Sequence, residues 1–341
     1  MTISLEVSWD LDGITMEGTV TRPDAAGPLP GVVLVAGSGP TDRNWCSPLL
    51  PGTNGAGQQF AEALAAAGIA SMRYDKRASG PHVMENVPKL MGKLSMGSHL
   101  DELAGAVHAF VDTGCVDPAR IIGLGNSEGT LHVLHYAASE QPIPFAGIIL
   151  AAPPGRPTRD LLLMQLGTQA AQLPNGDELM DKVRQACARF DAGGAMDPDP
   201  VLPEQVRMVL QSFETPVNLP LARELWGESA CDTLPRITIP VLVLIGGKDI
   251  QVDRYADGDV LQACTAGMDN VTFAFPPDAN HVFKQDTRPL DQVVAAPGSG
   301  YNESDSPLDP ESLSTIVRWI AGVPTTASGP GAVIAAPGPK S

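Results

Sequence analysis

The chain has 341 residues, with 22 Lys and Arg against 39 Asp and Glu, so its formal net charge is −17. This length suits one large α/β domain with an insertion, or two modest domains. The negative charge argues against nucleic acid as a partner, because phosphates need clustered cations, and it equally disfavours an anionic membrane surface.

Short apolar runs alternate with segments of helical period along most of the chain. Residues 3–22 predict an antiparallel hairpin, and strands are predicted at residues 31–36, 69–74, 120–124, 146–151, 240–245 and 271–275. Between them, helices are predicted at residues 58–67 and behind Ser98, whose spacing from Asp101 resembles a capping box. The runs are apolar throughout, so the fold class is α/β, with a mostly parallel central sheet flanked by helices.

The alternation stops between residues 152 and 235. This stretch contains no convincing strand and four helix-like segments, at residues 159–171, 178–190, 203–213 and 220–226. We interpret it as an all-helical insertion between two parts of one core, residues 1–151 and 236–323. Residues 286–308 are loop-like apart from an ambiguous segment at 290–295, and the Gly- and Pro-rich tail at 324–341 is expected to be disordered.

Targeting signals and cysteine motifs are not evident in the sequence. No window of about 18 apolar residues predicts a membrane span, and the first residues, MTISLEVSWD, lack the basic and apolar regions of a signal peptide. Five cysteines form no CxxC, so we expect neither a disulfide framework nor a zinc site: Cys46, Cys115, Cys187, Cys231 and Cys264. A reducing, cytoplasmic setting is therefore predicted.

A G-x-S-x-G motif, Gly125-Asn-Ser-Glu-Gly129, follows the apolar run 120–124 and precedes a helix-like segment at 130–138. In this strand–turn–helix setting the motif is typical of a catalytic serine. The sharp turn exposes the serine above the sheet and leaves no room for side chains at the flanking positions. Ser127 is therefore the predicted nucleophile.

The partners of such a serine follow it in the order acid, then histidine. The chain has six histidines, and five of them lie at or before position 135, so His281 is the predicted base. Asp249 is the first carboxylate after the strand at 240–245 and lies 32 residues before His281. Its role would be to hold the imidazole in the right tautomer. The rival acids lie further on: Asp253, Asp257 and Asp259.

Acyl transfer places negative charge on the carbonyl oxygen of the substrate, which needs preorganised N–H donors. One predicted donor is the backbone N–H of Glu128, directly after the nucleophile. The other belongs to the loop at residues 36–40, where the N–H of Ser38 is favoured and that of Gly39 is the rival. The predicted substrate contacts are Gly37, Gly39 and Asn126.

Together these residues resemble the α/β-hydrolase superfamily, and within it the bacterial serine carboxylesterases that carry a GSGPTDRD-type loop. That loop reads GSGPTDRN at residues 37–44, and further family-like stretches are RYDKR at 73–77, GGKD at 246–249 and NH at 280–281. The resemblance spans about residues 15–322. Asn126, Ala36 and Asn44 depart from the usual residues of the family, which leaves substrate preference open.

The resemblance implies that residues 152–235 form a cap over the active site. We expect most of its apolar side chains to pack the cap onto the main domain, and a few to line an acyl pocket: Leu161, Leu162, Leu163, Met164, Met180, Met208, Val209, Leu210, Leu225 and Trp226. Asp42 and Arg43 are expected to form an ion pair that stabilises the loop at 36–40, and a structural role is also expected for Arg77, His132 and His135.

The leading hypothesis is an ester hydrolase that acts on a small-molecule ester with a short to medium acyl chain, without a metal or organic cofactor. The same triad also serves amide or peptide hydrolases, thioesterases, lactonases, polyester hydrolases and acyltransferases. An aminopeptidase would need an acidic clamp, for which the insertion offers Asp177, Glu178 and Asp181. A non-catalytic binding protein is the remote alternative, a metal hydrolase is disfavoured because no HExxH occurs, and the oligomeric state stays open.

Overall fold

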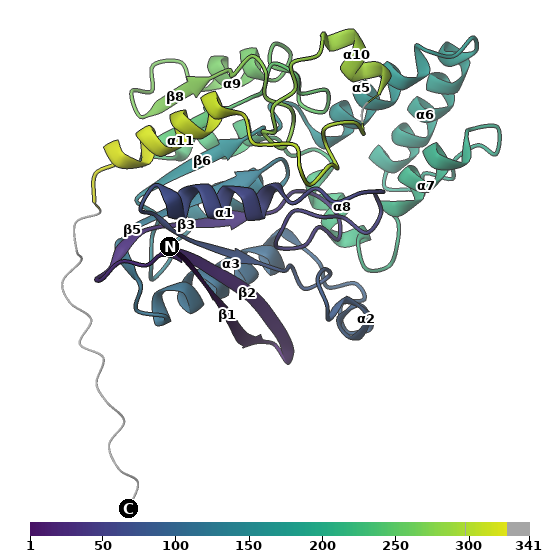
Figure 1. Ribbon diagram of the computed structural model, residues 1–341. Helices are drawn as coiled ribbons and strands as arrows, with labels where there is room; N and C mark the ends of the chain where they lie inside the picture. The colour runs from purple at the N-terminus through teal and green to yellow at the C-terminus, as the bar shows by residue number, and fades with distance from the viewer. Residues whose placement is uncertain (297, 326–341) are drawn as a thin grey trace, which may run out of the picture.

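The computed structural model describes residues 1–296 and 298–325 of the chain (Figure 1). Within these residues, eight strands form one sheet in the order β1-β2-β4-β3-β5-β6-β7-β8. Strands β3 to β8 pair in parallel, whereas β1 and β2 form an antiparallel hairpin that joins the sheet at β4. The predicted mostly parallel sheet with an antiparallel lead-in hairpin is confirmed.

The predicted strands match the observed ones within a few residues. The strands are β1 (Thr2–Leu11), β2 (Ile14–Pro23), β3 (Leu29–Val35), β4 (Ala70–Tyr74), β5 (Val116–Asn126), β6 (Gly147–Ala151), β7 (Val241–Leu244) and β8 (Val271–Ala274). The helices around the sheet are α1 (Ala56–Ala66), α2 (Val83–Asn86), α3 (Met96–Asp112), α4 (Gly129–Ala138), α9 (Gly258–Cys264), α10 (Leu290–Ala295) and α11 (Pro310–Gly322).

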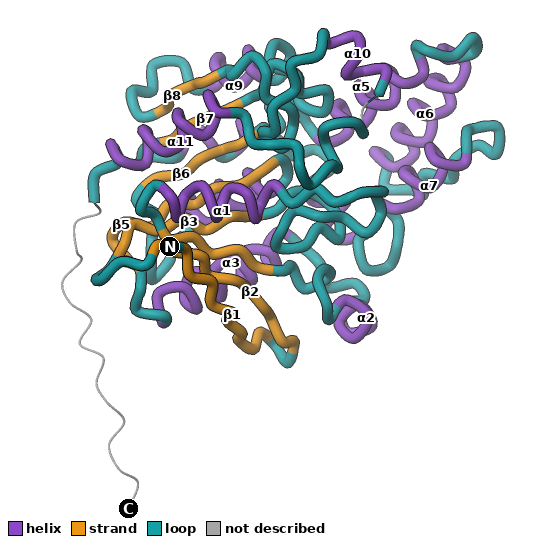
Figure 2. Tube along the Cα trace, viewed as in Figure 1, coloured by secondary structure: helices purple, strands orange, loops and turns teal. Residues whose placement is uncertain are grey.

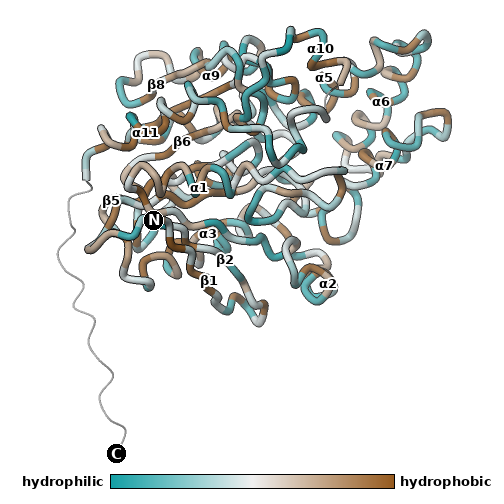
Figure 3. Tube along the Cα trace, in the orientation of Figure 1, coloured by the Kyte–Doolittle hydropathy of each residue, from teal (hydrophilic) through white to brown (hydrophobic). Residues whose placement is uncertain are grey.

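Helices cover both faces of the sheet. Figure 1 shows α1 and α11 side by side over one face, and α3 and α4 pack together on the strands from the other face. In Figure 2 the parallel strands lie between these two helical layers. Side chains on both faces of the inner strands are consequently buried, which is why the strand sequences are apolar throughout rather than alternating (Figure 3).

The ends of three parallel strands bring the predicted site together. Ser127 directly follows β5, Asp249 lies in the loop after β7, and His281 lies in the loop after β8. The carboxyl ends of parallel strands meet at one edge of the sheet, where such folds place their ligand sites. The sheet order β5-β6-β7-β8 therefore brings the Ser127 turn to two loops that lie more than 100 residues further along the chain.

The helical insertion has a hydrophobic core of its own. It comprises α5 (Thr158–Ala170), α6 (Gly176–Asp191), α7 (Glu204–Ser212) and α8 (Leu219–Leu225), followed by the 3-10 turns η2 (Ala230–Asp232) and η3 (Leu234–Arg236). Leu162, Met180, Leu210 and Trp226 pack with one another in a cluster separate from the main core. The expectation that such side chains mainly pack the insertion onto the main domain is therefore wrong for these four. The buried side chains of α5, α6 and α7 pack against one another in this cluster, together with Ala222 of α8.

Other apolar positions of the insertion behave differently. Leu225 joins the main core, as expected, whereas Met208 and Val209 are exposed on α7. Polar contacts hold the insertion to the rest of the chain: Arg156 Nη2 with Asp257 Oδ2 at 2.8 Å, Gln165 Nε2 with the carbonyl of Gln251 at 3.1 Å, and the N–H of Met96 with Glu224 Oε2 at 2.6 Å.

The start of α3 differs from the sequence prediction. The helix begins one turn earlier than expected, because Ser95 is the N-cap: its Oγ accepts a hydrogen bond from the Ser98 N–H at 3.0 Å. Ser98 completes the capping box by accepting a hydrogen bond from the Ser95 N–H at 2.9 Å, so it belongs to the first turn.

No helix of the described residues is both long and apolar enough to cross a bilayer. Residues 326–341 of the predicted tail lie outside the described residues.

Two of the five cysteines form a disulfide, contrary to the expectation from their sequence pattern. Cys231 in η2 is bonded to Cys264 at the end of α9, 33 positions away. Spacing alone gave no signal, because the two residues meet only when the end of the insertion packs on α9. Cys115 and Cys187 are buried free thiols, as expected of small apolar side chains. The cysteine argument for a reducing setting thus loses its basis.

Removal of this disulfide is expected to destabilise the fold. The double variant Cys231→Ser, Cys264→Ser should lose about 3 to 4 kcal/mol in the free energy of unfolding, because the unfolded chain is no longer constrained by a loop of this length. Urea unfolding of the wild type with and without reductant, beside the double variant, measures the difference. Reductant should destabilise only the wild type, and a double variant as stable as the oxidised wild type would contradict the prediction.

Candidate functional site

Ser127 stands in a strained turn between β5 and α4. Its φ is 55°, in the left-handed region that residues other than glycine rarely adopt. A side chain at Gly125 would overlap the carbonyl oxygen of Gly129, and a Cβ at Gly129 would lie 2.6 Å from the carbonyl oxygen of Ala36. The turn consequently requires glycine on both sides of the serine, which is the physical reason for the G-x-S-x-G pattern.

Asp249 and His281 form a buried pair. His281 Nδ1 lies 2.8 Å from Asp249 Oδ2, and the side chains of the two residues are 4% and 0% exposed, respectively. The other oxygen of Asp249, Oδ1, accepts the backbone N–H groups of Gln251 at 2.8 Å and Val252 at 2.9 Å. The carboxylate is therefore fixed on both oxygens, and it in turn fixes the plane of the imidazole.

The rival acids have other partners. Asp257 is fully buried and pairs with Arg156, and Asp253 Oδ1 accepts the N–H groups of Tyr255 at 2.9 Å and Ala256 at 2.7 Å. Both carboxylates stabilise the segment that leads into α9 and its contact with the insertion. Asp249 is the predicted acid that meets the histidine.

Asn126 joins the serine turn to the histidine loop. Its Nδ2 donates to the carbonyl of His281 at 3.0 Å and to that of Ala151 at 3.3 Å, while the Ser127 N–H donates to the same Ala151 carbonyl at 2.9 Å. Asn126 is 4% exposed. The hydrogen bonds of its amide thus position backbone, and the substrate contact expected for this side chain stays a prediction.

A buried lysine that the sequence analysis did not single out holds the histidine loop. Lys284 is fully buried, and its Nζ donates to the carbonyl oxygens of Asn54 and Glu303. Its backbone closes the loop around His281, since its carbonyl accepts the Asn280 N–H at 2.9 Å and its own N–H donates to Asn280 Oδ1 at 3.1 Å. A lysine in an otherwise mixed loop gives no sequence signal of this role.

The loop after β3 lies against the serine turn. A Cβ at Gly37 would be 3.3 Å from both the Cβ of Ser127 and the carbonyl oxygen of Asn126, so only a hydrogen fits there without displacement. Ser38 and Gly39 are exposed at the tip of the loop, and Gly39 has a φ of 73°. The structure therefore brings the predicted donor loop and the predicted nucleophile together.

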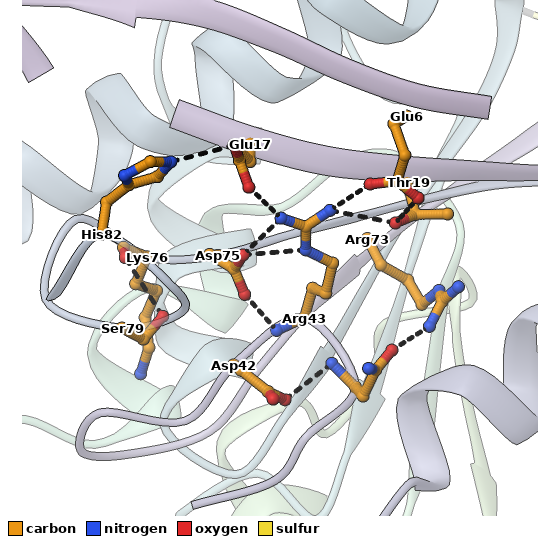
Figure 4. Close-up of polar contacts among 11 residues, drawn as sticks. Glu6, Glu17, Thr19, Asp42, Arg43, Arg73, Asp75, Lys76, Ser79 and His82 are labelled. Carbon is orange, nitrogen blue, oxygen red and sulfur yellow. Dashed lines mark hydrogen bonds and ion pairs between the residues drawn. The ribbon is translucent and has the colours of Figure 1, made fainter. Parts of the chain in front are cut away.

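Arg43 stabilises this loop, with partners other than the expected one. Figure 4 shows its guanidinium among three carboxylates: Asp75 at 2.6 Å, Glu17 at 2.8 Å and Glu6 at 2.6 Å. Asp42 does not pair with it; Asp42 Oδ1 instead accepts the N–H groups of Asn44 and Cys46 at 2.8 and 2.9 Å. Asp42 therefore stabilises a local turn, and burial raises the pKa of its carboxyl despite these two hydrogen bonds.

The RYDKR stretch at 73–77 connects the loop after β3 to its surroundings. Arg73 donates to Asn44 Oδ1, Asp75 pairs with Arg43, and Arg77 lies 3.4 Å from Glu102 of α3. Lys76 Nζ donates to the carbonyl of Gly37 at 2.5 Å. The sequence marked this stretch as family-like without a role, and the structure gives a structural role to each of these charged side chains.

A buried histidine cluster lies beneath the serine turn. His132 Nε2 is 3.3 Å from Glu128 Oε1, and the rings of His132 and His99 are 4.4 Å apart. Among the described residues, His99, Glu128 and His132 have ligand atoms within 4.8 Å of one another, the spacing needed to hold a metal ion. The charge of Lys76 acts on both Glu128 and His132, which disfavours an added cation, and the Glu128 carboxylate is already hydrogen-bonded to His132.

Burial controls the protonation of this cluster. Burial and the neighbouring His99 lower the pKa of His132 to about 4, against the opposing pull of Glu128. Burial raises the pKa of Glu128, but the hydrogen bond with His132 and the charge of Lys76 outweigh it and lower the pKa to about 2. At neutral pH Glu128 is therefore ionised and His132 is neutral.

The lowered pKa of His132 predicts a loss of stability on acidification. Between pH 6.5 and pH 4 the unfolded chain binds a proton at His132 that the folded chain does not, so stability is full above pH 6.5 and falls as pH drops towards 4. The expected loss is roughly 1 to 3 kcal/mol, since each pKa unit contributes about 1.4 kcal/mol. Urea unfolding at pH 7 and pH 4.5 measures it.

His132→Gln should flatten this pH dependence, whatever it does to stability at pH 7. The matched control is His108→Gln, because His108 is exposed on α3 and should leave the slope unchanged. Equal slopes for the wild type and both variants would refute the assignment.

Two clefts open on the surface away from the buried pair. One of about 870 Å³ lies between β1 and α3, and one of about 700 Å³ lies over the Arg43 cluster, next to Pro40. Ser127, Asp249 and His281 line neither. The second cleft adjoins the loop after β3, because Pro40 and Asp42 contribute to its lining.

Comparison with known proteins places the chain in a family. Residues 32–296, more than half of the chain, match the family described as alpha/beta hydrolase. Esterase EstD of Thermotoga maritima is 25% identical over 268 residues, which are 78% of this chain and 58% of that protein. The chain thus spans less than two thirds of the length of this curated relative.

Solved structures show the same fold at lower identity. Proline iminopeptidase from Mycobacterium smegmatis has a TM-score of 0.53 at 18% identity, over 94% of this chain and 98% of that one. An esterase from Pyrococcus furiosus has a TM-score of 0.51 at 16% identity, over 95% of this chain and 91% of that one. With the family match and the sheet order described above, the chain belongs to the alpha/beta hydrolase family.

Proposed function

We propose that the protein is a serine carboxylesterase, with Ser127 as nucleophile, His281 as general base and acid, and Asp249 as the residue that orients the histidine. The observation that carries the proposal is the buried bond between Asp249 and His281, in a loop whose backbone is tied to Asn126 beside the strained Ser127. Similarity to an esterase favours ester substrates. Membership of the carboxylesterase branch with the GSGPTDR-type loop is part of this proposal.

The proposed reaction has two halves. Ser127 Oγ attacks the acyl carbonyl while His281 Nε2 takes the proton of the Ser127 hydroxyl. The resulting oxyanion accepts hydrogen bonds from the backbone N–H groups of Ser38 and Glu128. The intermediate collapses as the proton passes from His281 to the leaving alkoxide, which leaves an acyl-serine. Water then attacks the acyl group with His281 as base, and the acid and free Ser127 are released. No metal or organic cofactor takes part in these steps.

We further propose that α5 to α8 form a cap that limits the acyl group to short or medium chains. In Figure 1 the insertion lies beyond the end of the sheet to which the β3 arrow points. Ser127, Asp249 and His281 follow β5, β7 and β8 at this same end. Gln165 of α5 bonds to the carbonyl of Gln251, two residues from Asp249, so the first helix of the insertion adjoins the acid loop.

An acidic clamp for a peptide amine has little support in this insertion. Asp177, Glu178 and Asp181 are exposed at the start of α6, and Asp181 pairs with Arg184 on the same helix. Solvated carboxylates of this kind have no site-specific partner to offer an amine. An ester substrate is therefore preferred over an aminoacyl amide.

The test combines labelling with a substrate panel. A fluorophosphonate probe should modify Ser127, and p-nitrophenyl esters of two to twelve acyl carbons should be hydrolysed fastest at the shorter lengths. Aminoacyl naphthylamides, acyl thioesters and lactones are assayed beside them. Faster turnover of one of those would replace the ester assignment, and absence of both labelling and turnover would favour a binding protein on this fold.

A further inference from the structure

Lys76 is a buried lysine whose ammonium group reaches the loop after β3. It is 4% exposed and follows Asp75 at the end of β4, but Figure 4 shows its side chain extending away from the carboxylates around Arg43. Its Nζ donates instead to the carbonyl oxygen of Gly37 at 2.5 Å. An ammonium group is costly to bury, so its place beside one particular carbonyl needs a physical reason.

The bonded carbonyl belongs to the same peptide unit as a proposed oxyanion donor. The carbonyl of Gly37 and the N–H of Ser38 share one planar trans peptide, in which the two groups point in opposite directions. A hydrogen bond that fixes the carbonyl on one side therefore fixes the N–H on the other. Gly37 lies against the Ser127 turn, so this peptide is next to the proposed nucleophile.

Without such a bond the peptide would have freedom to rotate. Gly37 and Gly39 have no side chains to restrict their backbone angles, and Gly39 has a positive φ. Ser38 between them is exposed, so its side chain is not held by packing. Thr41 Oγ1 holds the next carbonyl, that of Ser38, at 2.7 Å, but this bond lies on the far side of the Ser38 Cα. Lys76 thus supplies the fixed partner for the Gly37–Ser38 peptide itself.

Two neighbouring carboxylates stabilise the charged form of Lys76. The charges of Glu128 and Glu102 favour the protonated form of Lys76, against the burial that lowers the pKa of Lys76. Glu128, whose side chain is 15% exposed, supplies through its backbone the second proposed N–H donor. A cation behind the Gly37 carbonyl also polarises the Gly37–Ser38 peptide and makes its N–H a stronger donor.

We propose that Lys76 is a positioning residue of the oxyanion hole, which holds the Gly37–Ser38 peptide with the Ser38 N–H turned towards the reacting carbonyl of the substrate. This inference rests on the proposed serine esterase function. The hydrogen bond from the Ser38 N–H to the substrate strengthens when negative charge develops on the carbonyl oxygen. Lys76, which positions this N–H, is therefore expected to stabilise the transition state more than the bound substrate.

The experiment compares Lys76→Met with the wild type on a p-nitrophenyl ester and on a trifluoromethyl ketone, which binds serine hydrolases as an oxyanion-bearing hemiketal. Lys76→Met should lower kcat roughly 10- to 100-fold with KM changed less than about threefold, because loss of a whole oxyanion donor costs about 10²- to 10³-fold. The affinity for the ketone should fall by the same factor as kcat/KM. Lys76→Arg, which keeps the cation, should recover part of both.

The matched control is Arg77→Met, which removes an equally buried cation from the neighbouring position that contacts Glu102 and not Gly37. It should lose stability and keep kcat within about threefold. Full kcat in Lys76→Met, a loss of kcat without loss of ketone affinity, or an equal loss in Arg77→Met would each overturn the inference. If Lys76→Met does not fold, the parallel between kcat/KM and ketone affinity is decided on Lys76→Arg.

Failure of this inference is distinguishable from failure of the proposed function. Wild-type turnover and fluorophosphonate labelling of Ser127 are measured first. A wild type that shows neither removes both proposals, whereas an active wild type whose Lys76 variants keep kcat and ketone affinity removes the role of Lys76 alone.

Discussion

Ser127→Ala is expected to lower kcat for ester hydrolysis by about 10⁴- to 10⁶-fold, because the proposed acyl-enzyme can form only on its hydroxyl. The variant should fold normally, since alanine occupies the left-handed turn with the same Cβ as serine and the turn's hydrogen bond to Ala151 comes from the backbone. Turnover of a p-nitrophenyl ester and intact mass after fluorophosphonate treatment measure the effect. Neither turnover nor the mass increase should remain.

The matched control for this prediction is Ser71→Ala. Ser71 is fully buried on β4 and makes one long hydrogen bond, of 3.5 Å, to the carbonyl of Thr21. It should keep wild-type kcat and the probe adduct. A Ser127→Ala variant that retains more than about a tenth of the wild-type kcat would assign the chemistry to another residue.

The sheet was predictable because its pattern is local. Apolar runs of four to six residues indicate strands buried on both faces, and glycines around Ser127 reflect a turn that admits no side chain. The pair of Asp249 and His281 follows from the same logic, because the loops after parallel strands converge at one edge of the sheet. In these cases a short segment contains all the information that its conformation needs.

Contacts between distant segments were not predictable in this way. The bond between Cys231 and Cys264 depends on how η2 packs against α9, and a spacing of 33 residues does not reveal it. Arg43 was expected to pair with its neighbour in sequence, but Asp75 lies close to it in space and already accepts its backbone N–H at 2.8 Å. Lys76 and Lys284 look like surface residues in sequence, because their carbonyl partners lie in other loops.

The position of the helix start in α3 shows an intermediate case. Ser98 has the residue type of an N-cap, and so does Ser95 three positions earlier. The side chains of the two serines cap each other's backbone, so either spacing fits the local pattern. Glu224 of α8 accepts the Met96 N–H at 2.6 Å, and this contact between distant segments favours a helix that begins at Met96.

Asp249→Asn is expected to lower kcat by about 10⁴-fold with little change in KM, for a reason that lies in the backbone around it. The N–H groups of Gln251 and Val252 require an acceptor at the position of Oδ1, so the oxygen of the new amide must remain there. Its NH₂ group then takes the position of Oδ2, facing His281 Nδ1. A donor at that position makes Nδ1 an acceptor, and neutral imidazole then carries its proton on Nε2.

A histidine in that tautomer cannot take the proton of Ser127, so both ester turnover and the rate of fluorophosphonate labelling should fall together while the fold persists. Steady-state kinetics, labelling rates and urea unfolding of the same preparation separate these quantities. The matched control is Asp257→Asn, which alters a carboxylate equally buried in the same segment but paired with Arg156. It should lose stability and keep kcat within about threefold, because leaving Arg156 without its carboxylate affects the contact with the insertion and not the imidazole. Wild-type labelling rates in Asp249→Asn would show that the bond between Asp249 and His281 stabilises a loop and does not serve the chemistry of Ser127.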